Sequence, residues 1–335
     1  MILSKQMNRQ IKQSISTLAK LVLAAAIIAW LVKKDLIDFS VFQILLTPTW
    51  FLTCFGLIGI TMALGSYRWQ ILLKTQGFDI AFVEVFKLTL IGIFFNFAIP
   101  GGVGGDLVKG FYLVKDHPER RLVAAMTVLM DRVIGLFAMV IMPATVMLFD
   151  LERVFSDHTL TLIFLSIMGL LLTFVLSFGV AFSPTCYGWI ENSRRLKRIP
   201  AFSKIFLIYS AIHQYGKKQK AFWSTVFLSI LAQCFSITMI WVVGQAMNLQ
   251  WIPLHVYFFA TTVGFIVTAV PISPAGVGIG QAAFLFLFNA YLGQKTNLGP
   301  TAVTAVQMMN LLYGLGGAFF YMRWKKHAPQ SVCVE

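Results

Sequence analysis

The sequence has little charge for its length. Only 12% of its 335 residues are charged, whereas 58% are hydrophobic, and the mean hydropathy is +0.78. A soluble domain of this size could not remove so much apolar surface from water, so a soluble protein is excluded. A cleavable leader pattern is also lacking, because the basic first 20 residues lead into an apolar run without a clear small-residue cleavage site. We therefore expect an integral membrane protein that keeps its first apolar segment.

Motifs that carry catalytic or metal chemistry are scarce as well. The four cysteines form no C-x-x-C pair, and the five histidines contain no H-E-x-x-H pattern. The glycine clusters match neither the P-loop nor the G-x-G-x-x-G pattern. The sequence thus predicts no cofactor, no metal site and no enzymatic activity. The best catalytic candidates, His117 and Glu119, belong to "KDHPERR", which reads more simply as a solvated turn.

Acidic residues are few, and the excess of basic residues gives a net charge of +14. A strongly basic chain raises the question of nucleic acid. Here the basic residues flank apolar segments and do not form an aromatic-interleaved groove, which is the pattern of cytoplasmic loops in membrane proteins. We therefore expect membrane lipids as partners and no nucleic acid.

What the sequence has in abundance is long apolar runs. The predicted fold is an all-α integral membrane protein with about six spanning helices, at 17–32, 49–67, 121–149, 160–183, 221–246 and 299–322. Two further apolar regions, 82–117 and 252–294, are each interrupted by a Pro/Gly cluster. We interpret both as re-entrant hairpins of opposite orientation, the first open to the cytoplasm and the second to the outside.

The distribution of Lys and Arg supports this topology. The predicted topology places four of the 27 Lys and Arg residues outside, namely Lys33, Lys34, Arg153 and Lys295, and one, Arg132, within a span. The remaining 22 lie on the cytoplasmic side, as the positive-inside rule requires. Other arrangements that restore the same parity remain alternatives. The whole chain, 1–335, is predicted to be one polytopic domain of the bacterial cytoplasmic (inner) membrane with both termini in the cytoplasm.

One segment between the spans is predicted to be neither loop nor crossing. The region 184–220 is basic, and apolar residues recur in it at helical spacing, at Ile205, Ile208, Tyr209, Ile212 and Tyr215. This pattern favours a helix lying in the cytoplasmic headgroup region. An ordinary amphipathic connector is the alternative.

The two interrupted regions share a short repeat. Pro100-Gly101-Gly102-Val103-Gly104 and Pro274-Ala275-Gly276-Val277-Gly278 are identical at four of five positions. Related broken elements of opposite orientation are typical of inverted-repeat transporters, whose binding site lies near the midplane. Helices that restart near Asp106 and Gly280 would direct unpaired N–H groups toward the membrane interior, where they could bind an anion.

Charged residues inside apolar segments complete the candidate site. Asp131 and Arg132 lie within a predicted span, and Asp106 and Lys109 lie three residues apart after the first break. We expect Lys109 and Arg132 to contact a phosphate and the aspartates to hold them, with Asn96 and Gln281 adding neutral hydrogen bonds. The alternative is structural: Asp106 caps a helix with Lys109 as its partner, Asp131-Arg132 clamps the hairpin, and the two amides satisfy freed backbone groups. The predicted binding residues are Asn96, Pro100, Gly101, Gly102, Gly104, Gly105, Asp106, Lys109, Asp131, Arg132, Pro274, Gly276, Gly278 and Gln281.

At these motifs the chain resembles the flippase-like transmembrane domain of lysylphosphatidylglycerol synthases and its stand-alone relatives. The resemblance rests on Asn96, the run Pro100 to Asp106 with Lys109, the pair Asp131-Arg132, and the stretch Pro271 to Gly278. Three positions depart from the family pattern: Lys109 replaces a common arginine, Asp131 a common glutamate, and Gln281 a frequent glutamate. The last change weakens any proton-coupled role at Gln281.

The resemblance implies lipid translocation. It does not imply lysyl transfer, because the large soluble transferase domain is absent and only 323–335 follow the last predicted span. We therefore expect a flippase that moves a phosphate-bearing, anionic or aminoacylated lipid through a midplane cavity. Some relatives are linked to isoprenoid-linked sugars or hopanoids, so the lipid stays open.

Two other functions remain as alternatives. One is a membrane-embedded transferase acting on a lipid carrier. The other is a non-catalytic subunit that serves a lipid-modifying synthase, with the basic region 184–220 as its docking surface. The oligomeric state is open, and the predicted architecture leaves room for a dimer.

Overall fold

The computed structural model describes residue 33 and the ranges 40–98, 104–193, 202–270 and 273–326. These ranges form an all-α protein, and no strand occurs in them. The helices in chain order are α2 (Ser40–Leu45), α3 (Pro48–Thr75), α4 (Phe82–Ala98), α5 (Gly104–Asp116), α6 (Arg121–Phe149), α7 (Leu151–Ser156), α8 (His158–Phe182), α9 (Pro184–Asn192), α10 (Phe202–Lys217), α11 (Gln219–Ala246), α12 (Leu254–Ala269), α13 (Ile279–Leu292) and α14 (Leu298–Lys326). Two short 3₁₀ turns, Pro118–Arg120 and Pro274–Gly276, precede α6 and α13.

Five helices in the described ranges are long and apolar enough to cross a membrane: α3, α6, α8, α11 and α14. They confirm five of the six predicted spans, and the sixth, 17–32, lies outside the described residues. α8 is the most apolar of the five and the least buried, and it exposes Leu165, Leu172 and Leu176. An apolar, outward-facing surface of this kind suits contact with lipid, so the protein is a multi-pass membrane protein.

One span is longer than predicted. α3 continues past residue 67 to Thr75, so Arg68 lies within the helix and not in the loop that follows it. The extra two turns bury Trp69, Leu72 and Leu73. An arginine is tolerated there because Asp131 of α6 pairs with it.

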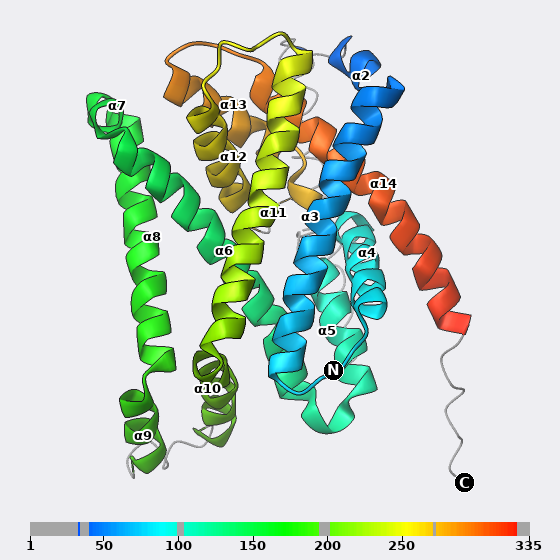
Figure 1. Cartoon of the computed structure of the whole chain (residues 1–335), viewed down its shortest axis with the longest axis vertical. Coiled ribbons are helices and arrows are strands. Elements are labelled where there is room, and N and C mark those ends of the chain that lie inside the picture. Colours follow the sequence, from blue (N-terminus) through cyan, green and yellow to red (C-terminus); the bar gives the residue numbers. More distant parts are fainter. Residues whose placement is uncertain (1–32, 34–39, 99–103, 194–201, 271–272, 327–335) are drawn as a thin grey trace, which may run out of the picture.

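Each interrupted region forms two helical arms that pack against each other. α4 packs on α5, and α12 packs on α13. Figure 1 shows the first pair in the lower half of the molecule and the second pair in the upper half, with α6 and α14 crossing the bundle obliquely. The two hairpins therefore open toward opposite ends, as the inverted repeat predicts.

The two hairpins also meet each other. The 3₁₀ turn Pro274–Gly276 at the second break contacts α4, and α14 packs against both α4 and α13. The contact between α14 and α4 is close, because a Cβ at Gly317 would collide with the carbonyl oxygen of Leu90. This packing sets the turn of the second break against the first arm of the other hairpin.

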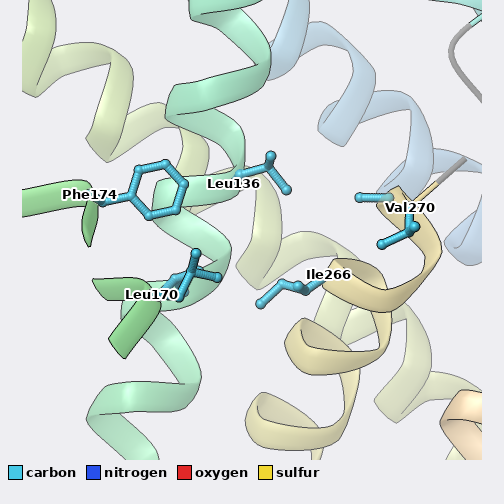
Figure 2. A pocket seen from close by; sticks show the side chains of 7 residues that line it. Leu136, Leu170, Phe174, Ile266 and Val270 are labelled. Carbon is cyan, nitrogen blue, oxygen red and sulfur yellow. The ribbon is translucent and has the colours of Figure 1, made fainter. Parts of the chain in front are cut away.

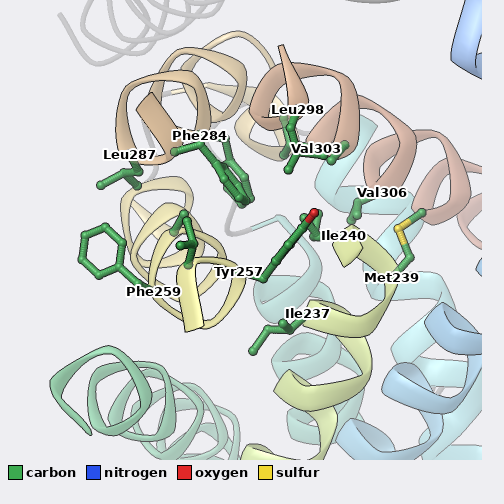
Figure 3. Close-up of a cluster of buried hydrophobic side chains, with 14 of the residues drawn as sticks. Ile237, Met239, Ile240, Tyr257, Phe259, Phe284, Leu287, Leu298, Val303 and Val306 are labelled. Atoms are coloured by element: carbon green, nitrogen blue, oxygen red, sulfur yellow. The ribbon is translucent and has the colours of Figure 1, made fainter. Parts of the chain in front are cut away.

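The largest apolar core joins the second hairpin to its neighbours. Figure 3 shows Tyr257, Phe259 and Phe284 of the hairpin among side chains of α11 and α14, such as Ile240 and Val303. All five are at most 2% exposed. Burial of this kind, in a membrane, stabilises mainly through packing contacts rather than through release of water.

The region 184–220 contains two helices, α9 and α10. The predicted helix through Ile205 and Tyr215 is confirmed as part of α10. It packs against α6 and α8: the buried Tyr215 lies in a cluster with Ile134 of α6, and Tyr209 donates to the Val180 carbonyl of α8, whereas Ile205 is exposed. The basic run 194–198 lies outside the described residues.

Candidate functional site

The first hairpin is closed by an amide side chain. Asn96, in the last turn of the described part of α4, accepts a hydrogen bond at Oδ1 from the backbone N–H of Gly105 at 2.8 Å. Gly105 is buried against the backbone of Gly92, where a side chain would collide. Asn96 thus satisfies a freed N–H group at the start of α5, which is the structural role that the sequence left as an alternative. Pro100, Gly101 and Gly102 lie outside the described residues, whereas Gly104 begins α5 and is buried.

Asp106 in the first turn of α5 forms an ion pair with Arg132 of α6. The Arg132 Nη1 and Asp106 Oδ2 atoms lie 2.8 Å apart, and the two side chains are 31% and 34% exposed. The structural alternative made Lys109 the partner of Asp106, and that part of it is wrong. Arg132 takes that place because α5 and α6 pack side by side and bring it across to the helix start.

Lys109 lies one turn further along α5. Its Nζ lies 5.2 Å from the centre of the Trp69 ring, within cation–π distance. Trp69 is 1% exposed, and its indole N–H donates to Thr127 Oγ1 at 3.4 Å. The ion pairs formed within the described ranges do not include Lys109. It is therefore a half-buried cation held by an aromatic ring without a carboxylate.

Asp131 faces away from Arg132 and pairs with Arg68 of α3. Arg68 Nε and Asp131 Oδ1 lie 2.7 Å apart, with side chains 15% and 12% exposed. Arg68 Nη1 also donates to Ser229 Oγ of α11 at 3.0 Å. Asp131 thus holds Arg68, not Arg132 or Lys109. The sequence analysis did not identify Arg68, because it ended the span at residue 67. The carboxylate of Asp131 within a span could have indicated that a cation such as Arg68 lies beside it.

Across α3, α5 and α6, three cations face two carboxylates. Asp131 neutralises Arg68 in the nearly buried pair, and Asp106 neutralises Arg132 in the more exposed pair. Lys109 is left over, so the cluster carries one formal positive charge more than negative. A site with this balance, at the first turns of a half-helix, can hold an anion.

The second break is neutral, and its amide Gln281 is bonded internally, whereas the buried hydroxyl of Ser273 has no hydrogen-bond partner among the described residues. Gly276 and Gly278 have φ of 72° and 83°, a left-handed region that favours glycine, and Ala275 has φ of 48°. Gln281 is 1% exposed and caps α13: its Oε1 accepts from the Gly278 N–H at 2.7 Å. Pro274 begins the turn that precedes this cap.

The amide nitrogen of Gln281 is occupied as well. It donates to Thr304 Oγ1 at 3.0 Å and to Gln307 Oε1 at 2.7 Å, both on α14. Gln307 in turn donates to the Ala275 carbonyl at 3.4 Å. Gln281 therefore bonds a backbone N–H group freed by the break and links the break to α14. This is the structural role that the sequence left as an alternative. Asn96 plays the matching part in the first hairpin.

The structure gathers seven predicted residues at the first hairpin and four at the second. The former are Asn96, Gly104, Gly105, Asp106, Lys109, Asp131 and Arg132, and the latter are Pro274, Gly276, Gly278 and Gln281. Only the first group is charged. No cluster of three or more His, Cys, Asp or Glu side chains suited to a metal occurs in the part of the chain that the structure describes.

Comparison with known proteins fits this arrangement. The family model described as "Lysylphosphatidylglycerol synthase TM region" matches residues 17–317. The chain belongs to this family. The match covers both hairpins, the first part of α14 and every residue of the charged cluster.

Two archaeal proteins are similar to this chain over most of their length. A "UPF0104 membrane protein" of Methanocaldococcus jannaschii is 22% identical over 285 residues, which are 79% of this chain and 80% of that protein. Another protein of the same description, from Methanothermobacter thermautotrophicus, is 21% identical over 288 residues, 78% of this chain and 81% of that protein. No solved structure matches the chain. Since both relatives are archaeal, the bacterial membrane stays a prediction.

Proposed function

We propose that this family member is a lipid flippase of the cytoplasmic membrane, which moves a lipid with a phosphate-bearing headgroup between leaflets. The observation that carries the proposal is Lys109, a half-buried cation without a carboxylate partner beside the half-exposed Asp106–Arg132 pair. A charge within an apolar layer costs on the order of 2.5–3.5 kcal/mol on insertion scales. An anionic headgroup would offset that cost by completing the charge balance.

The site offers a phosphate two different kinds of contact. Lys109 is a compact point charge, whereas the planar guanidinium of Arg132 can bind two oxygens at once. Asp106 accepts from Arg132 in the absence of a ligand and keeps the guanidinium at the start of α5. The N-terminal N–H groups of α5 add partial positive charge on the same side.

The two hairpins supply a means of moving the headgroup. They open toward opposite ends of the molecule and touch where the second break meets α4. Relative movement of the hairpins would expose the charged site to each leaflet in turn, as in other inverted-repeat transporters. The described residues of the second break, 273–281, carry no charged side chain, and the Gln281 amide is bonded internally, so its part is to close the route and not to bind the charge.

Reconstitution in liposomes tests the proposal. The purified protein is assayed for transbilayer movement of phosphatidylglycerol, lysyl-phosphatidylglycerol, cardiolipin, phosphatidylethanolamine and undecaprenyl phosphate. We expect headgroup-selective movement that Lys109→Ala reduces about tenfold, which corresponds to ~1.4 kcal/mol of lost interaction.

Lys87→Ala is the matched control. It removes the same charge from the other arm of the hairpin, where Lys87 is paired with Glu84 at 2.7 Å. It should move lipid at the wild-type rate. A folded Lys109→Ala protein with wild-type transport would refute the proposed site. Folded wild-type protein that moves none of the lipids would refute transport and favour a subunit that serves a synthase.

A further inference from the structure

An apolar cavity lies between α6, α8 and α12, beside the second break. Its volume is about 330 Å³. Figure 2 shows Leu136 of α6, Leu170 and Phe174 of α8, and Ile266 and Val270 pointing toward one another around it. Ala269 and Val140 complete the lining, and no polar side chain takes part. The volume falls in the range of roughly 300–1,000 Å³ typical of sites that bury small ligands.

The cavity lies at mid-depth in the bundle. Leu136 lies near the middle of α6 (Arg121–Phe149), and Leu170 lies near the middle of α8 (His158–Phe182). The third wall comes from the last turn of α12 and the residue after it, where the second hairpin breaks. Leu170 is 39% exposed and Val270 is 50% exposed, so the cavity borders the outer, apolar surface of the molecule.

The cavity is also close to the charged cluster along one helix. Arg132, Leu136 and Val140 follow one another at intervals of four residues, which places them on one side of α6. One such interval is a rise of about 6 Å along the helix axis. Arg132, whose guanidinium pairs with Asp106, thus lies one turn along α6 from a hydrocarbon-lined cavity.

From this arrangement we infer that the cavity binds a hydrocarbon chain of the transported lipid while its headgroup lies against Lys109 and Arg132. The inference rests on the proposed function and extends it to the substrate class: an anionic amphiphile with at least one chain that leaves the bilayer and enters the protein. Only a hydrocarbon ligand suits the lining, because a polar one would lose its hydrogen bonds there.

The depth of the cavity distinguishes a lipid in transit from a resident lipid. The headgroup of an ordinary membrane lipid stays at the interface, roughly 15 Å from the midplane of a hydrocarbon core about 30 Å thick. A headgroup beside Arg132 has left that interface, and the chain that follows it needs an apolar space at the same depth. If a methylene group takes up about as much volume as a water molecule in the liquid, roughly 30 Å³, the cavity of about 330 Å³ has room for about ten such groups.

Photo-crosslinking tests the inference. The probes are phosphatidylglycerol and phosphatidylcholine that carry a diazirine at the same mid-chain carbon, and labelled peptides are mapped by mass spectrometry. We expect phosphatidylglycerol to label the cavity walls around Leu136, Leu170 and Ile266 well above phosphatidylcholine. Both lipids should label the outward face of α8 around Leu176 equally.

Two variants address the cavity. Ala269→Phe fills it, and we expect cavity labelling by phosphatidylglycerol to fall about tenfold. Val175→Phe is the matched control, since Val175 is 52% exposed on α8, one of the helices that line the cavity. It should leave the labelling unchanged. Lys109→Ala should lower cavity labelling by phosphatidylglycerol but not by phosphatidylcholine, because it weakens binding of the anionic headgroup.

The outcomes separate this inference from flipping itself. Equal cavity labelling by both lipids, or labelling that Ala269→Phe does not reduce, would overturn it. If one of these labelling results is found, and Ala269→Phe transports lipid at the wild-type rate while Lys109→Ala does not, then the flippase proposal stands and the chain site is wrong. Headgroup-dependent labelling in a protein that moves no lipid would support the chain site and refute flipping.

Discussion

Arg68 on α3 and Asp131 on α6 form a nearly buried ion pair, with 2.7 Å between Nε and Oδ1. Arg68 also donates to Ser229 of α11, so a single guanidinium ties three helices together. Asp131 and Arg132 are neighbours in sequence but face different partners. The first belongs to the framework, and the second faces the start of the half-helix α5.

We expect Arg68→Met to destabilise the fold by about 3 kcal/mol, because removing one partner leaves the Asp131 charge uncompensated. The double variant Arg68→Met/Asp131→Leu should recover most of that loss. The measurement is unfolding in mixed micelles with increasing denaturing detergent. Glu84→Gln is the control; it breaks the exposed Glu84–Lys87 pair and should cost at most ~1 kcal/mol. Equal losses in the two single variants would show that the Arg68 pair is not a structural tie.

Gln281 provides a second test of the framework. Gln281→Leu removes the acceptor for the Gly278 N–H and both bonds to α14, so we expect a loss of about 1–3 kcal/mol. Gln281→Glu keeps an acceptor but loses the donors, and should also be destabilised. The same unfolding assay applies, with Gln214→Leu on the exposed side of α10 as the control. A Gln281→Leu protein as stable as the wild type would show that the amide does not stabilise the second break.

The close packing of the first hairpin predicts opposite effects at two glycines of α5. In Gly105→Ala the new methyl group would collide with Gly92 and crowd Asn96 Oδ1, so the hairpin should open and transport should fall with stability. Gly110→Ala meets nothing within 4 Å and should stabilise α5 by up to about 1 kcal/mol through helix propensity. Thermal unfolding of both proteins in detergent checks this. Similar melting temperatures for the two variants would contradict the close approach of α4 and α5.

Asp157, which precedes α8, predicts a pH dependence at the end of the bundle away from the first hairpin. A hydrogen bond from the Leu160 N–H lowers the pKa of its carboxyl group. A lowered pKa in the folded state means that the ionised carboxylate stabilises the fold above the unfolded pKa of about 3.9, and that this is lost as pH falls through the folded pKa.

The difference in melting temperature between wild type and Asp157→Asn, followed from pH 6 down to about 2.5, measures that contribution. Asparagine also caps a helix but does not titrate, so the wild-type protein should lose its advantage over the variant only at the acidic end. A difference that stays constant over the whole range would show that the charge of Asp157 does not contribute.

Much of the fold was accessible from the sequence because the signals are local. Hydropathy located α3, α6, α8, α11 and α14, since each span must supply its own apolar length. The repeated Pro/Gly clusters predicted two hairpins, because several such residues close together disfavour a continuous helix. The boundary of α3 was missed, since Arg68 counts as a loop residue until its partner on another helix is known.

The sequence by itself determined that this chain is an all-α membrane protein, where its helices break, and which charged and amide residues stand beside the breaks. These follow from composition and from spacing along one chain. Only the tertiary structure decided the partners: Arg132 for Asp106, Arg68 for Asp131, and Trp69 for Lys109. The physical reason is that ion pairs form between whichever side chains helix packing brings within a few ångströms. Within the cluster on α3, α5 and α6, that packing leaves Lys109 without a carboxylate.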